Sequence, residues 1–146
     1  MSTLFSIGVF AILFDESGRV LLCHRRDMDV WNLPGGGAAS REMPTETAIR
    51  ETREETGLDV VTVRLVGVYS KSDKDELVFT FHCRPIGGEL TTSNETDACQ
   101  YFAIADIPAN TLPKHVERIH DALNSEASPI FHRQTLPSMK EFLQRL

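Results

Sequence analysis

The stretch GGGAASREMPTETAIRETREETGL, residues 35–58, contains the signals that organise this chain. Pro44 suits the first turn of a helix, and Gly57 suits the left-handed residue that ends one. The residues between them therefore predict a helix. The three glycines before it predict a loop whose backbone can approach a ligand closely and adopt positive φ.

Three glutamates share one face of this predicted helix. At about 100° per residue, Glu51, Glu54 and Glu55 fall within roughly 100° of one another. Such a cluster is costly to bury unless a cation neutralises it. Arg50 can pair with Glu54 four residues later, and the remaining carboxylate oxygens suit Mg²⁺ or Mn²⁺. Because acidic runs on helices are usually solvated faces, spacing alone leaves that alternative open.

The neighbouring face of the helix has smaller and less polar side chains. We expect Ala48, Ile49, Thr52 and Thr56 to pack inward against the rest of the domain.

The longer pattern resembles the signature of the Nudix hydrolases, G-x5-E-x7-R-E-U-x-E-E-x-G-U, in which U is bulky and aliphatic. The matching residues, all in register, are Gly36, Glu42, Arg50, Glu51, Glu54, Glu55, Gly57 and Leu58. Thr52 departs from the signature, because it stands where the family has an aliphatic residue. We expect this departure to have a modest stability cost and to leave the chemistry unchanged.

The resemblance assigns roles within the site. It implies that Arg50, Glu51 and Glu54 are catalytic residues, and that Glu42 and Gly57 support the structure. A downstream acid completes the site in some members of the family. The implied metal ligands are Glu51, Glu54, Glu55, the backbone carbonyl of Gly35 and, from the later loop, Glu95, with Asp97 as the second choice. A solvated loop acid is an equally good interpretation of Glu95.

Substrate contacts are predicted on the flanking loops. Arg25, Arg26, Lys71 and Lys74 are the basic residues expected nearest to the site, although each can also be an ordinary surface charge. Trp31 can stack on a base or pack in the core. Together with the glycine loop, the substrate-binding candidates are Arg25, Arg26, Trp31, Gly36 and Gly37.

The function implied by the resemblance is hydrolysis of a nucleoside diphosphate linked to a further group X, with Mg²⁺ or Mn²⁺ as cofactor. Water attacks a diphosphate bond whose charge the metal offsets. We favour ADP-ribose or another nucleotide sugar as substrate. The alternatives are hydrolysis of a nucleoside triphosphate to a monophosphate and pyrophosphate, and a non-catalytic domain that senses nucleotides. Such sensors typically lose a signature glutamate, and this chain keeps all of them.

The length, composition and charge of the chain limit the kinds of protein that it can be. A chain of 146 residues with 41% hydrophobic and 25% charged residues predicts one globular domain, residues 1–146. The net charge of −6 argues against binding to nucleic acid or anionic membranes. The three scattered cysteines indicate reduced thiols, and the apolar run at residues 4–14 is too short to span a bilayer. We therefore expect a cytoplasmic protein.

Hydrophobic patterning predicts a mixed α/β fold. We expect residues 5–14 and 19–25 to form a hairpin, followed by strands at 60–69, 77–84 and 100–104. Residues 85–88 should end a strand, and residues 94–97 should form a loop. Helices are predicted at 114–124 and 138–146, and the second of these could cover a partner in a homodimer. The resemblance implies a mixed sheet sandwiched between helices.

Overall fold

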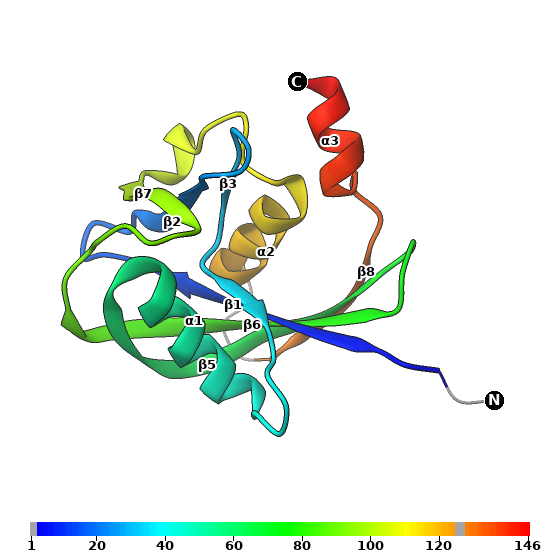
Figure 1. Ribbon diagram of the computed structural model, residues 1–146, viewed down its shortest axis with the longest axis horizontal. Helices are drawn as coiled ribbons and strands as arrows, with labels where there is room; N and C mark the ends of the chain where they lie inside the picture. Colours follow the sequence, from blue (N-terminus) through cyan, green and yellow to red (C-terminus); the bar gives the residue numbers. More distant parts are fainter. Residues whose placement is uncertain (1–2, 125–127) are drawn as a thin grey trace.

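The computed structural model describes residues 3–124 and 128–146 (Figure 1). The helices are α1 (Pro44–Thr56), α2 (Pro113–Asn124) and α3 (Met139–Arg145), with a short 3-10 helix at Ile104–Asp106. The strands are β1 (Ser6–Leu13), β2 (Val20–Arg25), β3 (Trp31–Asn32), β4 (Gly35–Gly37), β5 (Leu58–Lys71), β6 (Glu76–Gly88), β7 (Thr96–Phe102) and β8 (Ile130–Gln134).

These strands form two sheets. The larger is mixed, with the order β4-β1-β6-β5-β8, in which β1 pairs with β6 and β5 with β8 in parallel. The smaller sheet is antiparallel, with the order β3-β2-β7. The expected mixed sheet between helices is confirmed, and the separate small sheet is an addition to it.

Strand β1, which lies between β4 and β6, has one half of the core on each of its two faces. Val9 and Ala11 pack on the face of the sheet that also holds Ala48 of α1. Ile12 packs on the other face, with Ile119 of α2. Because successive side chains of a strand point to opposite faces, the continuous apolar run in β1 is explained by a helix on each side, as Figure 1 shows.

The predicted signals at both ends of α1 are confirmed. Pro44 is its first residue, and Gly57 follows its last with φ of 80°, its amide donating to the carbonyl of Arg53. Met43, which precedes the helix, has no side-chain cap, but its amide donates to the Glu46 carboxylate at 3.0 Å. Ala48, Thr52 and Thr56 are buried as predicted, whereas Ile49 is 39% exposed, so its inward packing was wrongly predicted.

The predicted hairpin of residues 5–14 and 19–25 is wrong as a sheet pairing. The turn between them exists, but only the isolated bridge Phe14–Val20 joins the two segments. Beyond that bridge, β1 pairs with β4 and β6, and β2 pairs with β3 and β7. Leu21 and Leu22 are both fully buried, because β2 contributes to both halves of the core.

Several strand boundaries differ from the prediction, and β5, for example, is longer at both ends than the expected 60–69. β6 continues through Pro85 to Gly88 instead of ending there. Its ladder with β1 stops at Cys83. At Pro85 the strand is therefore unpaired on that side, where the backbone N–H that proline lacks is not needed for a ladder hydrogen bond. β7 begins at Thr96, inside the expected loop, and ends at Phe102 because Ile104 starts the 3-10 helix.

Strand β8 was not predicted. The end of the chain forms α3 as expected, although the helix begins at Met139 and Ser138 serves as its N-cap. Within the described residues, no helix has the length and apolar character needed to cross a membrane.

Candidate active site

Three carboxylates from two parts of the chain converge beside the glycine loop. Oxygen atoms of Glu51 and Glu55 on α1 and of Glu95, just before β7, all lie within 4.8 Å of one another. Helical spacing places the first two on one face, and the fold brings the third to them. This acidic cluster is an all-oxygen donor set, which fits Mg²⁺ or Mn²⁺.

Glu55 is the most buried member of the acidic cluster. The residue is 8% exposed, and its Oε2 accepts a hydrogen bond from the Gly35 amide at 2.9 Å. Burial raises the pKa of its carboxyl from 4.5 to about 8, and the neighbouring charges of Glu51 and Glu95 add to this rise. Burial likewise raises the pKa of Glu51. Full ionisation of the cluster is therefore costly without a cation.

Arg50 organises the carboxylates beside the acidic cluster. Its Nε and Nη2 donate to the two oxygens of Glu42 at 2.7 and 3.0 Å. Its Nη1 donates to Glu51 at 3.1 Å and to Glu54 at 3.2 Å, which confirms the predicted pair with Glu54. Hydrogen bonding with Arg50 lowers the pKa of Glu42 to about 2. Glu54 itself is exposed and lies outside the group of three, so its role as a metal ligand stays a prediction.

The glycine loop forms β4 and borders the acidic cluster closely. A Cβ on Gly36 would lie 2.7 Å from the Glu51 carboxylate, and one on Gly35 would lie 2.2 Å from the backbone oxygen of Val9. The carbonyl of Gly37 accepts from Arg50 Nη2 at 3.2 Å. Close neighbours thus exclude a side chain at positions 35 and 36, whereas position 37 has space for one. The carbonyl of Gly35 as a metal ligand stays a prediction.

A cavity of about 620 Å³ opens beside the acidic cluster, a size typical of small-molecule sites. Glu55, Glu95, Gly35 and Gly36 line one part of it. The predicted basic residues Arg25, Arg26, Lys71 and Lys74 also line it.

Two predicted candidates have other surroundings. Trp31 does not line the cavity, and instead packs edge-to-face against His24 and Phe102, with ring centroids 5.1 and 4.9 Å away. Asp97 accepts a hydrogen bond from His24 Nδ1 at 2.7 Å, whereas its neighbour Glu95 joins the acidic cluster. Of the two downstream acids, Glu95 therefore has the position that a ligand needs.

Sequence reasoning missed the contribution of α2 to the cavity. Lys114, His115 and Arg118 line it, and all three are buried. In the sequence, the one indication of this contribution was that basic residues alternate with the apolar stripe of α2. Only the tertiary structure shows that this helix begins at the cavity wall.

The fold and the acidic site together indicate a class of protein, and comparison with known proteins gives the same class. The NUDIX domain family model matches residues 4–123, so the chain belongs to the NUDIX family. It is a hydrolase of the Nudix class. The match spans the acidic helix, the glycine loop and most of both sheets.

Individual relatives and structures cover most of the chain. A MutT-like protein of Streptomyces ambofaciens is 33% identical over 121 residues, which are 83% of this chain and 79% of that protein. A Bacillus subtilis protein named as a candidate 8-oxo-dGTP diphosphatase is 30% identical over 122 residues, 83% of this chain and 82% of that protein. The crystal structure of an ADP-ribose pyrophosphatase from Streptococcus suis superposes with a TM-score of 0.74 at 23% identity, over 90% of this chain and 100% of that chain. This last similarity concerns the fold.

Proposed function

We propose that this protein hydrolyses a diphosphate bond in a nucleoside diphosphate linked to a further group X, with a divalent cation as cofactor. The observation that carries the proposal is the convergence of Glu51, Glu55 and Glu95 in one acidic cluster, two members of which, Glu55 and Glu95, line a nucleotide-sized cavity. The donor set favours Mg²⁺, with Mn²⁺ as an alternative. When bound, the cation offsets the negative charge of the phosphates and lowers the pKa of water.

The chain's own residues bind and orient the reactants. Arg25 and Arg26 line the cavity near the acidic cluster and are suited to bind phosphate oxygens. Arg50 holds Glu51 and Glu54 in place, so the carboxylates need little reorganisation when substrate binds. One of the glutamates on α1 accepts the proton of the attacking water. Such a reaction needs positioning and charge, without a covalent nucleophile.

Two substrate classes are supported. ADP-ribose or another nucleotide sugar is our first candidate, because a neighbour with the same fold is an ADP-ribose pyrophosphatase. A nucleoside triphosphate is the second, because a relative of similar length is named as a candidate 8-oxo-dGTP diphosphatase. Both substrates contain a diphosphate bond, which is the bond that we propose is cleaved beside the acidic cluster.

A substrate panel tests this function. The full chain is incubated with Mg²⁺ and ADP-ribose, other nucleotide sugars or nucleoside triphosphates, and phosphate-containing products are separated and identified. Glu54→Gln and Glu55→Gln should lower the rate strongly, whereas the exposed control Glu89→Gln should not. Absence of cleavage by the wild type, or full activity in both α1 variants, would overturn the proposal.

A further inference from the structure

The cavity has a second end where positive charge is concentrated. Lys71 and Lys74 from the β5–β6 hairpin line this end, together with Lys114 and Arg118 from α2. Lys71 forms an ion pair with Glu76. Among the described residues, no ion pair involves the other three cations.

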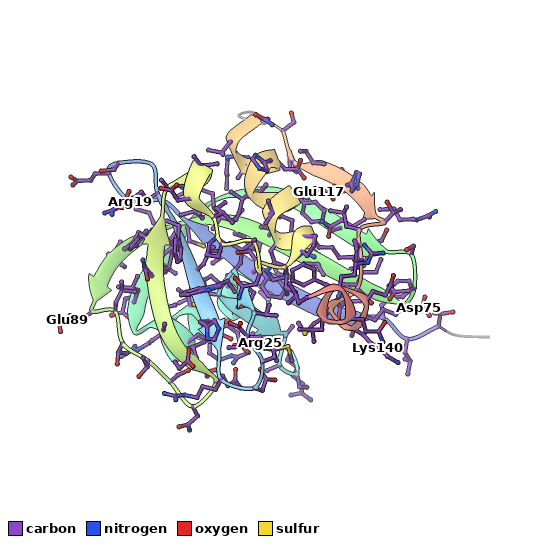
Figure 2. The ribbon with its side chains drawn as sticks, turned by 90° about the horizontal axis from the view of Figure 1, so that it is seen from above. Arg19, Arg25, Asp75, Glu89, Glu117 and Lys140 are labelled. Atoms are coloured by element: carbon purple, nitrogen blue, oxygen red, sulfur yellow. The ribbon has the colours of Figure 1, made fainter. Side chains whose placement is uncertain are left out.

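The basic end is built from elements that are far apart in the sequence. Figure 2 shows α3 end-on beside α2, close to the hairpin turn that carries Asp75. Pro137, Ser138 and Met139 at the start of α3 line the cavity there. One acid, the exposed Asp73, lies at this end of the cavity, whereas the other acids that line the cavity, Asp27, Glu55 and Glu95, belong to other segments. The charge of this wall is thus predominantly positive, in contrast to the acidic cluster.

Arg118 is a buried cation that is only partly satisfied. The residue is 1% exposed, and its Nε and Nη2 both donate to Oε1 of Gln134, at 3.1 and 2.8 Å. Its guanidinium carbon lies 5.3 Å from the ring centroids of Phe10 and of Tyr69. Nη1 is buried and has no hydrogen-bond partner among the described residues. A buried charge without an anionic partner is unfavourable, and burial lowers the pKa of Arg118 to about 10.

Two neighbouring residues on α2 add donors to the same wall. Lys114 is 8% exposed, and burial lowers its pKa. His115 accepts the Leu33 amide hydrogen bond on Nδ1, at 3.0 Å. Burial keeps the pKa of His115 well below its ordinary value. Its neutral ring therefore carries the proton on Nε2, where it can donate.

We propose that this basic end, formed by Lys71, Lys74, Lys114 and Arg118, is an anion subsite that binds a phosphate group of the substrate other than the diphosphate that is cleaved. The inference rests on the proposed function and narrows its substrate class. A phosphorylated nucleotide sugar or a nucleoside triphosphate supplies such a group, and ADP-ribose does not. The acidic cluster repels this group, so charge complementarity fixes which way the substrate lies in the cavity.

Binding of inorganic phosphate tests the subsite without catalysis. The full chain is titrated with phosphate by calorimetry in the presence of a chelator, which removes any contribution of bound metal. Lys114→Gln and Arg118→Gln should weaken phosphate binding roughly tenfold, the effect of losing one charge-assisted hydrogen bond. The exposed controls Lys140→Gln and Arg84→Gln should bind as the wild type does.

Two results would overturn the subsite. One is the absence of saturable phosphate binding by the wild type. The other is wild-type affinity in Lys114→Gln, which is informative even if Arg118→Gln fails to fold, because within the described chain only the backbone carbonyl of Lys114, and not its side chain, takes part in a hydrogen bond.

Hydrolysis then separates this inference from the proposed function. With Mg²⁺, kcat/KM is compared for ADP-ribose and for its derivative with a phosphate on the anomeric carbon of the terminal ribose. Lys114→Gln should lower the ratio of the two values roughly tenfold. Phosphate binding that depends on Lys114, without hydrolysis of any nucleotide, leaves the subsite standing and overturns the function. Hydrolysis of both nucleotides with equal kcat/KM, by a protein that does not bind phosphate, supports the proposed function and overturns the subsite.

Discussion

Substitution of Glu55 by glutamine should make the metal-free protein more stable at alkaline pH while it abolishes tight metal binding. The Glu55 carboxyl is buried, and its pKa in the folded protein is about 8. The unfolded chain loses this proton near pH 4.5. Between these values the folded state holds a proton that the unfolded state has released. The stability contribution of Glu55 is therefore full below pH 4.5 and is lost as the pH rises through about 8.

The size of the effect follows from this linkage. Each pH unit within the interval costs about 1.4 kcal/mol, so the free energy of unfolding falls by roughly 3 to 4 kcal/mol between pH 5 and pH 8. Glutamine at position 55 cannot ionise, and its side-chain oxygen can still accept the hydrogen bond from the Gly35 amide. The variant should therefore lack this part of the pH dependence.

Chemical denaturation with a chelator, at several pH values, measures the difference. The wild-type curve should fall relative to Glu55→Gln as the pH rises, and Mg²⁺ should restore stability in the wild type alone. Glu54→Gln, which changes an exposed carboxylate on the same helix, should keep the wild-type slope. Parallel curves for wild type and Glu55→Gln would refute the reasoning, because they would mean that Glu55 ionises equally in both states.

Three further variants probe the helix and the loop. Thr52→Val should raise the free energy of unfolding by about 1 kcal/mol in chemical denaturation, because it removes a buried hydroxyl without a hydrogen-bond partner in the described chain. Gly36→Ala should weaken Mg²⁺ binding roughly tenfold in calorimetry, because the new Cβ displaces the Glu51 carboxylate. Arg50→Lys should raise the midpoint of acid unfolding, since Arg50 keeps the pKa of Glu42 at about 2, and this stabilisation is lost as the pH falls from 4.5 towards 2.

Each of these variants has a matched control. Thr47→Val should destabilise the protein, because the Thr47 hydroxyl donates a hydrogen bond of 2.7 Å to Glu42. Gly37→Ala should leave Mg²⁺ binding unchanged, since its Cβ would meet no atom nearer than 4.0 Å. Arg53→Lys, at an exposed position, should leave acid unfolding unchanged. A control that behaves like its test variant contradicts the corresponding explanation.

Local signals explain why α1 could be predicted from the sequence. Pro44 and Gly57 act within their own turns, and the spacing of Glu51 and Glu55 is a property of any helix. The pairing of β1 and β2 could not be predicted in the same way. A turn motif specifies a reversal of the chain, whereas the choice of sheet depends on distant partners such as β6 and β7.

The parts of the structure that the sequence did not predict, β8 and the role of Arg118, also depend on contacts between distant segments. The residues of β8 are mostly exposed and lack an alternating pattern, and the strand exists because it pairs in parallel with β5. Gln134 in that strand is fully buried and binds Arg118 of α2. Without this pairing, nothing in the sequence distinguishes Arg118 from a surface arginine. The acidic half of the site was therefore predictable, whereas the basic half was predictable only for Lys71 and Lys74 and not for Lys114 and Arg118 of α2.

The acidic cluster also has a consequence for the motions of the molecule. Glu51 and Glu55 belong to a helix that packs on the large sheet, whereas Glu95 directly precedes β7 of the small sheet. A cation held by all three carboxylates would add a cross-link between α1 and the start of β7, which the Thr96 hydroxyl already joins by donating to the Glu55 carbonyl at 2.8 Å. Amide hydrogen exchange in β7 should then slow when Mg²⁺ is added, because local opening of the small sheet would require release of the ion.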